Sequence, residues 1–413
     1  MLRKLRLSEI YYTLVVLGYT ATLCVSFMRP GVFAAALMVL VGAELLLRRE
    51  LRIKSLPDIM AVLFFAYQLL SVVWLLAGGY PLSVYLSELT ASVLPMIFYF
   101  VGKSAGEDTK KWMKWYLIAM LILGILGVIL YAWAPQFYND WSYDWSYNSK
   151  ADVATTRVRM NSVVGSTCLS FNMVAGMLAG ALFLTGDSKE EQGQNHPRRD
   201  LIFGIACIAL CLLFAILANQ RSGLVAAGLV ILYLNVLLVF VLKLVPKKAF
   251  YIEIGVAAIL IVALAVISPD ALLKYWYRII SLPGAVAERS EQWVAAVNNM
   301  TSFWFGNGLG ANGHHALGIE GAHVIADGGL IKLYCENGIF GFSMWLYLLI
   351  LSAKRGLAKI GTHYVSLGIV AVGLLQSIGS NILAFQLCAP VFWFAVGSMC
   401  AGSEDEASQR PDA

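Results

Sequence analysis

Long apolar stretches alternate with short polar segments from one end of the sequence to the other. Each stretch is nearly free of charged residues and has about the 20 residues that an α-helix needs to cross a bilayer. Hydrocarbon offers no partner for unpaired backbone groups, so such stretches must be helical. The pattern predicts twelve spanning helices, at about 10–28, 31–47, 59–77, 82–101, 115–133, 167–185, 201–218, 223–242, 249–267, 330–353, 364–380 and 383–401.

The composition agrees with this pattern and excludes an ordinary soluble enzyme. Hydrophobic residues make up 59% of the 413 positions and charged residues only 13%, whereas a typical soluble domain has about 25% charged residues. We therefore predict an all-α, polytopic integral membrane protein, with one membrane domain over 1–402 and a polar tail over 403–413. The net charge of +5 is carried by short clusters between apolar runs, which is typical of topology signals. We expect no nucleic-acid partner.

The distribution of Lys and Arg predicts the orientation. If the twelve stretches alternate in direction, 21 of the 30 Lys and Arg residues fall on one side of the membrane. The positive-inside rule assigns that side, and with it both termini, to the cytoplasm. The other side carries two long loops, 134–166 and 268–329, which we expect to be periplasmic. Loops longer than about 15 residues in a compact protein are usually functional or disordered, so we expect the function there.

The outward side keeps few positive charges, and most of them are arginines. Arg157 and Arg159 lie in the first large loop, Arg221 in a short link between two apolar stretches, and Arg289 in the second large loop. A guanidinium group binds carboxylate or phosphate oxygens through two hydrogen bonds and stays charged when partly desolvated. The alternative is contact with lipid headgroups or with a helix C-terminus. That alternative is weakest for Arg221, because a charge between two almost uninterrupted apolar helices tends to face a cavity.

Three ionisable residues follow one another where the second loop enters the next helix. Imidazole is the side chain whose unperturbed pKa lies near neutrality, so His323 is suited to deprotonate a hydroxyl, although a solvated loop histidine explains it equally well. Asp327 either orients such a histidine or caps the helix. Glu336 falls inside the predicted span, where an ionisable group indicates function by default. A pair with Lys332 four residues earlier accounts for it almost as well.

Two further patterns in the second loop do not predict cofactor chemistry. Residues 308–313 match GxGxxG, but no strand precedes them, so we expect a flexible glycine-rich loop and no dinucleotide site. His314, His315, His323 and Asp327 lack the spacing of a zinc site. We therefore expect neither a metal nor a cofactor.

The first loop contains the tetrapeptide DWSY twice, at 140–143 and 144–147. Trp141 and Trp145 therefore lie beside acidic residues, an arrangement that stacks on sugar rings and hydrogen-bonds to them. Tryptophan and tyrosine also gather at membrane interfaces without a binding role. Both explanations stay open for these two residues.

Four motifs follow one another along the chain: NQRSG at 219–223, ERSEQW at 288–293, FGNGLG at 305–310, and His323 ahead of LIKLYCENGIFG at 330–341. In their order and membrane sidedness they resemble the O-antigen polymerase and O-antigen ligase superfamily of bacterial envelopes. The resemblance covers roughly residues 150–345 by motif and the whole chain by topology.

The resemblance implies a metal-independent glycosyltransferase of the bacterial inner membrane. Members of the superfamily act at the periplasmic face on glycans carried by undecaprenyl diphosphate, without nucleotide sugars. Arg221 and Arg289 would hold the diphosphate, with Arg157 or Arg159 as the first-loop arginine and His323 as the base. Preorganised guanidinium groups in a poorly hydrated cavity would stabilise the charge that grows on the leaving oxygen. The remaining expected substrate contacts are Asp327, Glu336, Trp141 and Trp145.

Two details favour a polymerase over a ligase within this resemblance. In ligases the histidine is usually followed by asparagine, whereas Val324 follows it here, and the run at 157–166 resembles the polymerase arrangement. A polymerase would transfer the glycan en bloc to a lipid-linked repeat unit, with the lipid bilayer and a chain-length regulator as further partners. A ligase acting on lipid A-core is the alternative. A transporter of the same glycan is an alternative of another class, which intramembrane ionisable residues or broken helices would favour.

Overall fold

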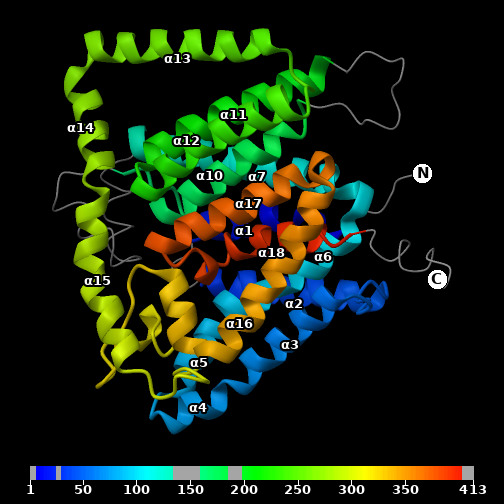
Figure 1. Cartoon of the computed structure of the whole chain (residues 1–413), viewed down its shortest axis with the longest axis vertical. Coiled ribbons are helices and arrows are strands. Elements are labelled where there is room, and N and C mark those ends of the chain that lie inside the picture. The colour runs from blue at the N-terminus through cyan, green and yellow to red at the C-terminus, as the bar shows by residue number, and fades with distance from the viewer. Residues whose placement is uncertain (1–5, 25–28, 134–158, 185–197, 402–413) are drawn as a thin grey trace.

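The computed structural model describes residues 6–24, 29–133, 159–184 and 198–401, and this part of the chain is helical or irregular, without a β-strand. The helices form one bundle (Figure 1). They are α1 (Leu7–Ala21), α2 (Pro30–Leu47), α3 (Leu56–Leu70), α4 (Val72–Ala77), α5 (Leu82–Glu88), α6 (Phe98–Ala105), α7 (Thr109–Trp133), α10 (Ser166–Ala181), α11 (Arg198–Ala218), α12 (Arg221–Leu234), α13 (Lys247–Ile267), α14 (Pro269–Ile280), α15 (Leu282–Asn298), α16 (Gly329–Ala358), α17 (Ile360–Gly379) and α18 (Ala389–Ser398). Short π or 3-10 turns are η1 (Leu89–Val93), η2 (Leu94–Ile97), η3 (Gly106–Asp108), η4 (Asn235–Val241), η5 (His314–Ala316) and η6 (Ile382–Ala384).

The prediction of an all-helical membrane protein is confirmed, whereas the count of twelve spanning helices is not. Each of the twelve predicted ranges overlaps a helix, and eight helical stretches within the described residues are long and apolar enough to cross a membrane. The second predicted loop, 268–329, is largely ordered, because α14 and α15 occupy its first half. The first predicted loop lies mostly outside the described residues.

The centre of the bundle is formed by α10 and α18. Both helices are mainly apolar and almost entirely buried, as expected for helices that other helices surround. Glycines let the backbones of α6 and α18 touch: a Cβ at Gly102 would overlap the carbonyl of Phe394, and a Cβ at Gly397 would overlap that of Tyr99. Small residues at helix contacts are the usual means of close packing in membranes.

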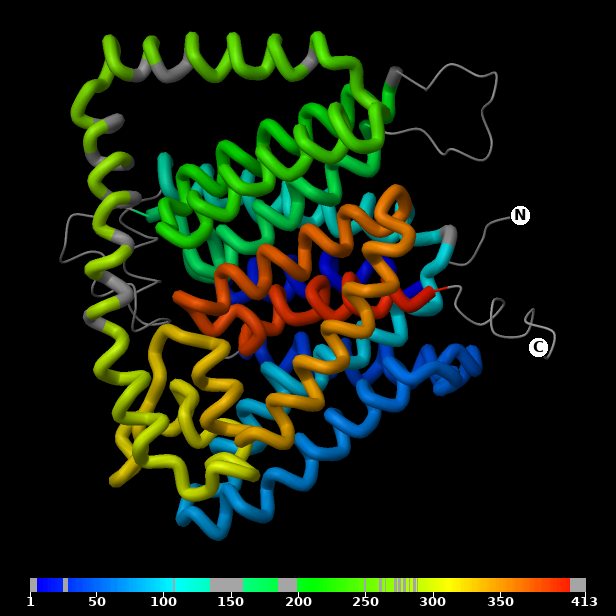
Figure 2. The backbone as a smooth tube through the Cα atoms, in the orientation of Figure 1, coloured from blue at the N-terminus to red at the C-terminus, as the bar shows by residue number. Residues whose placement is uncertain are grey.

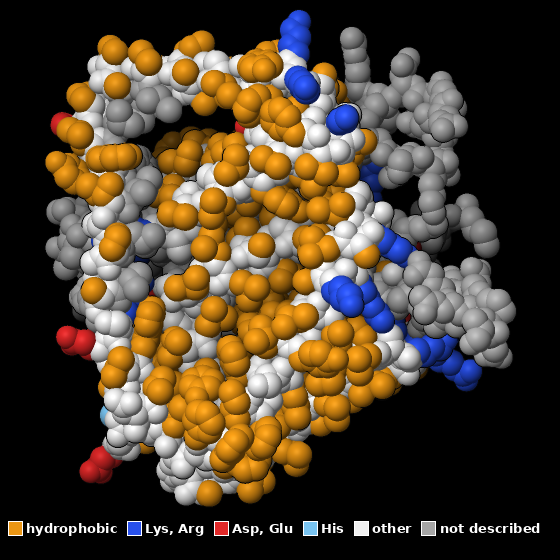
Figure 3. Space-filling model, in the orientation of Figure 1, with side chains coloured by type: hydrophobic (Ala, Val, Ile, Leu, Met, Phe, Trp, Pro, Cys, Tyr) orange, Lys and Arg blue, Asp and Glu red, His pale blue; other side chains and the backbone are white. Residues whose placement is uncertain are grey.

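Two helices lie along one end of the bundle, and a third stands apart from it. Figure 2 shows α14 and α15 running down this end, while most of α13 is separated from the rest of the bundle and is joined to it through η4 at one end and α14 at the other. We call the end that carries α14, α15 and residues 299–328 the loop face. In Figure 3 apolar side chains cover much of the visible surface, and most visible Lys and Arg side chains gather at the edge away from α14 and α15.

The helix α16 is broken within its first third. Gly338 has non-helical dihedral angles (φ 57°, ψ −169°), so the helix stops at Asn337 and starts again after the glycine. A break frees backbone groups that hydrocarbon cannot satisfy. Tyr67 from α3 meets one of them, because its hydroxyl donates to the carbonyl of Asn337 at 2.6 Å.

A segment of the second loop satisfies most of the remaining groups at the break. We call residues 303–313 the glycine loop. The N–H groups of Ile339 and Phe340 donate to the carbonyls of Phe303 and Trp304 (3.0 and 3.2 Å). In return, the N–H groups of two residues in the glycine loop, Asn307 and Gly308, donate to the carbonyls of Cys335 and Glu336 (2.9 and 3.0 Å).

Glycine is required at the centre of this contact. Gly306 has a φ of +78°, and a Cβ there would lie 2.5 Å from the carbonyl of Glu336 and from the N–H nitrogen of Gly338. Residues 306–313 are all buried. The expectation of a flexible loop at 308–313 was therefore wrong: its glycines allow the chain to lie directly against α16.

We expect Gly306→Ala to destabilise the protein strongly, because the methyl group would meet backbone atoms that cannot move aside. Backbone strain and overpacking together cost about 2–4 kcal/mol. Gly321→Ala is the matched control, since Gly321 has a φ of +77° and nothing within 4 Å of a Cβ, so it suffers the backbone strain alone, about 1 kcal/mol. Thermal unfolding of the purified protein in detergent measures both. Equal losses for the two variants would contradict the proposed contact.

Candidate functional site

Arg289 and Asp327, two residues predicted to form the site, meet at the loop face. Arg289 lies on α15, and its Nη2 atom is 2.7 Å from Oδ2 of Asp327, just before α16. The two side chains are 31% and 39% exposed, so the pair can exchange its partners with a ligand. The N-cap of α16 is Gly328, not Asp327, and it makes no side-chain capping bond.

Three helices fix the position of this ion pair. Nη1 of Arg289 donates to the carbonyl of Gly379 at the end of α17 (3.4 Å). Trp293, one turn after Arg289 on α15, donates from its indole nitrogen to the carbonyl of Asp327 (2.7 Å). Gly328 adopts a φ of +135°, and a Cβ there would overlap the Trp293 indole. The carboxylate and the guanidinium are therefore held between α15, α16 and α17.

A second ionic cluster lies deeper in the bundle. Nζ of Lys332 is 2.7 Å from Oε1 of Glu88 and 3.1 Å from Oε2 of Glu336. These three side chains are only 6%, 3% and 2% exposed. Ser92 donates to the carboxylate of Glu88, and the backbone N–H of Asn312 donates to that of Glu336 at 3.3 Å. We call Glu88, Lys332 and Glu336 the buried cluster.

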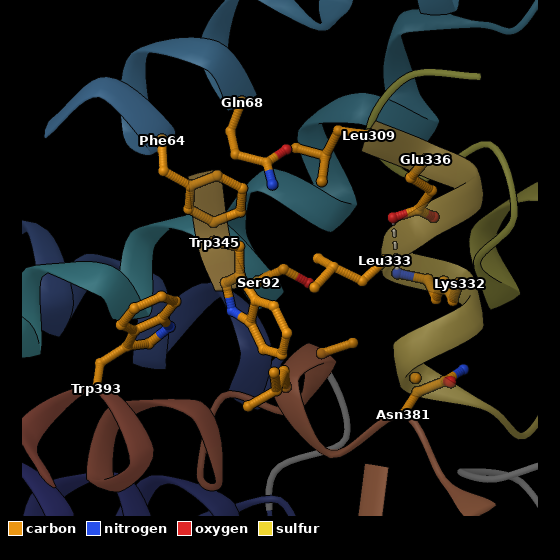
Figure 4. A pocket seen from close by; sticks show the side chains of 13 residues that line it. Phe64, Gln68, Ser92, Leu309, Lys332, Leu333, Glu336, Trp345, Asn381 and Trp393 are labelled. Carbon is orange, nitrogen blue, oxygen red and sulfur yellow. Dashed lines mark hydrogen bonds and ion pairs between the residues drawn. The ribbon is translucent and has the colours of Figure 1, made fainter. Parts of the chain in front are cut away.

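The buried cluster borders a small pocket of about 40 Å³. Figure 4 shows Lys332 and Glu336 on one side of it and the rings of Phe64, Trp345 and Trp393 on the other. A water needs roughly 10–15 Å³ of such space, so the pocket has room for a few waters. The remaining lining residues are Gln68, Ser92, Leu309, Gly329, Leu333, Asn381, Leu383 and Ala384.

Two amide oxygens at the pocket have no hydrogen-bond partner in the protein. They are Oε1 of Gln68 and Oδ1 of Asn381, whose residues are 3% and 4% exposed. Nδ2 of Asn381 donates to the carbonyls of Ile325 and Ala326 (3.0 and 3.2 Å), immediately before Asp327. The pocket therefore runs from Asn381, which holds the backbone just before Asp327, to the buried cluster.

His323 lies at the loop face and is half-buried. Asn312 donates from its side-chain amide to the backbone carbonyl of His323 at 2.7 Å. This bond positions the backbone, and the imidazole takes no part in it. Asn312 also contacts Glu336 through its own N–H, so one residue of the glycine loop links His323 to the buried cluster.

Arg221 is the first residue of α12 and is half-buried. Near the other end of α12, the hydroxyl of Tyr233 donates to the carbonyl of Tyr364 near the start of α17 (2.8 Å). The two helices thus run antiparallel, which places Arg221 at the end of the bundle where α17 reaches Gly379, the residue that Arg289 contacts. The predicted pair of arginines therefore shares one end of the molecule.

Arg159 lies near the same corner. The next residue, Met160, donates its N–H to the carbonyl of Leu217, four residues before Arg221. Gln220 donates to the hydroxyls of Ser166 and Thr167 at the start of α10 (2.7 and 2.8 Å). Three other predicted substrate contacts lie outside the described residues: Arg157, Trp141 and Trp145.

Sequence reasoning found part of the buried cluster and missed the rest. The pair of Lys332 with Glu336, an alternative raised by their spacing of four residues, is confirmed. Glu88 was missed as the partner of Lys332, although a carboxylate inside an apolar stretch is itself a signal. Among the described residues, no group of three or more His, Cys, Asp or Glu side chains could hold a metal ion.

No model of a known protein family matches the chain, and no curated protein matches it significantly.

Proposed function

We propose that the protein is a polysaccharide polymerase of the bacterial inner membrane, with both termini in the cytoplasm and the loop face in the periplasm. It transfers a glycan from undecaprenyl diphosphate en bloc to a hydroxyl of a lipid-linked repeat unit. The observation that carries the proposal is the position of Arg289. Its guanidinium is only partly exposed, is held between three helices, and lies at the same end of the bundle as Arg221.

The proposed step needs positive charge at the leaving group. The acceptor oxygen forms a bond to the anomeric carbon, and the bond from that carbon to the diphosphate breaks, leaving its electron pair on a phosphate oxygen. Guanidinium groups that are already in place stabilise this charge without reorganisation. Arg289 and Arg221 supply such groups at the loop face, and the segment that carries Arg159 lies beside Arg221.

His323 is the proposed base. It would take the proton from the acceptor hydroxyl as the new glycosidic bond forms. Because Asn312 holds the His323 backbone through its carbonyl, that bond does not occupy the nitrogen that would receive the proton. Asp327 is proposed to release Arg289 when the diphosphate enters, since a half-exposed ion pair contributes only up to about 1 kcal/mol. A ligase would use the same donor site with lipid A-core as the acceptor.

A transporter of the same lipid-linked glycan is a second candidate, and two observations favour it. Glu88, Lys332 and Glu336 form an ionic cluster within predicted membrane spans, and Gly338 breaks α16 beside that cluster. Ionisable groups and discontinuous helices inside the membrane are features of transporters. We still prefer the transferase, because the arginines lie at the loop face and not at the cluster.

We expect Arg289→Ala and Arg221→Ala each to abolish long-chain polysaccharide while the protein remains inserted. Arg→Lys variants should restore little, because a point charge cannot reproduce the two-bond contact of a guanidinium group. The measurement is a gel of surface polysaccharide, with membrane fractions blotted for the protein. Arg48→Ala is the control, since Arg48 pairs with Glu44 on α2. Normal long chains from either loop-face variant would rule out the diphosphate role.

Asp327→Asn should strengthen binding of undecaprenyl diphosphate. The substitution removes the carboxylate that competes with phosphate for Arg289, which corresponds to a gain of up to about fivefold in affinity. Native mass spectrometry or thermophoresis of the purified protein would measure it. Undecaprenol, which lacks the diphosphate, is the matched ligand and should bind both proteins equally. Weaker diphosphate binding to the variant would show that Asp327 is not a competitor.

Deleting the gene in its host distinguishes the candidate functions. For a polymerase we expect lipid A-core that carries a single repeat unit, because capping continues without elongation. A ligase would leave core without any repeat and would accumulate lipid-linked polymer. The complementing variant His323→Ala should reproduce the deletion, whereas His314→Ala, in the same loop, should restore long chains. Long chains from the His323 variant would exclude this residue as the base.

A further inference from the structure

The buried cluster carries more negative than positive charge. Two carboxylates, on Glu88 and Glu336, face one ammonium group, on Lys332, and all three side chains are less than a tenth exposed. If both carboxylates were ionised, one net negative charge would remain in the interior. Burying an uncompensated charge is so costly that a group normally changes its protonation state instead.

The surrounding groups do not offset this charge. Ser92 and the N–H of Asn312 donate hydrogen bonds to the carboxylates but bring no net charge. The other titratable groups that interact with the cluster are His314 and His315 in η5, Tyr80 between α4 and α5, and Cys335 on α16, and Asp327 in turn interacts with His314. None of them is a permanent cation.

The protein shifts the pKa values of one histidine and one tyrosine beside the cluster toward their neutral forms. Desolvation by neighbouring protein atoms and the positive charge of Lys332 both lower the pKa of His314. Burial and the nearby Glu336 carboxylate raise the pKa of Tyr80. The side chains of His314 and His315 are both exposed, so water screens their interaction with the cluster.

The pocket gives the cluster space for water molecules. Lys332, Glu336 and Ser92 all line it, and it extends to Gly329 and to Asn381, whose amide donates to the backbone of residue 325 at the loop face. The unpartnered oxygens of Gln68 and Asn381 are acceptors for water molecules, which normally satisfy such buried groups. A chain of waters between these oxygens would carry protons between the loop face and the carboxylates.

We propose that Glu88, Lys332 and Glu336 form a binding site for one exchangeable proton, which the two carboxylates share and which enters through the pocket. The bound proton makes the cluster neutral. Because the carboxylate of Glu336 also holds Asn312, and Asn312 holds the backbone of His323, loss of the proton is transmitted to the loop face. The proposal does not depend on the reaction that the protein catalyses.

The test is the pH dependence of thermal stability for the purified full-length protein in detergent. At a pH above the usual pKa of carboxyl groups, the folded protein still holds the shared proton, whereas the unfolded chain has lost it. The free energy of unfolding therefore falls as pH rises. One extra bound proton corresponds to a tenfold change in the unfolding equilibrium constant per pH unit. For a chain of this size the melting temperature should fall on the order of 1–2 °C per pH unit between about pH 6 and 9.

Three variants separate the cluster from other titrating groups. Glu336→Gln and Glu88→Gln each leave one carboxylate opposite Lys332, so no extra proton is needed. The slope of melting temperature against pH should then flatten. Lys332→Met leaves two carboxylates without a cation, so the slope should become steeper. In difference infrared spectra, the wild-type protein should show a protonated-carboxyl band that disappears in Glu336→Gln or Glu88→Gln.

Two controls should keep the wild-type slope. Glu9→Gln removes a buried carboxylate from a balanced pair with Lys111, and His314→Gln with His315→Gln removes the nearby histidines. A wild-type slope in both glutamine variants of the cluster would overturn the proposal. So would a melting temperature that depends on sodium concentration at fixed pH but not on pH, since the site would then bind a metal cation.

Discussion

The break in α16 imposes the main constraint on this structure, because every backbone group that it frees must find a partner inside the bundle. Tyr67 and the glycine loop provide these partners. Only glycine at 306 and 338 allows the glycine loop and α16 to approach closely enough. The glycine loop then places Asn312 against Glu336 and below His323. The positions of both the pocket and the loop-face residues thus depend on the hydrogen bonds that satisfy the backbone at the break in α16.

The two ionic sites differ in what they can do, although Asp327 of the first and Lys332 of the second are only five residues apart. Arg289 and Asp327 are partly hydrated, so exchanging one anionic partner for another has a low energetic cost. Lys332 and its two carboxylates are buried away from water, and removal of Lys332 would leave both carboxylates without a cation. The first arrangement suits reversible ligand binding, and the second suits binding of a small neutralising species.

Local features could be predicted from the sequence, whereas contacts between distant segments could not. The apolar stretches located the helices, and the spacing of four residues indicated the pair of Lys332 and Glu336. Glu88 lies 244 residues from Lys332, and no local pattern links them. The glycine loop was expected to be flexible because glycines favour turns in isolation. Its burial depends on the kink at Gly338, which looked like an ordinary glycine in an apolar run.

The position of the glycine loop in the chain has a consequence for biosynthesis. All the identified partners of the break in α16, namely Tyr67 and residues 303–308, precede α16 in the sequence. During translation they are therefore made before the interrupted helix leaves the ribosome. The backbone groups freed at Gly338 can therefore form their hydrogen bonds as α16 enters the membrane. If the partners followed α16 in the sequence, these groups would stay unsatisfied until the partners had been synthesised.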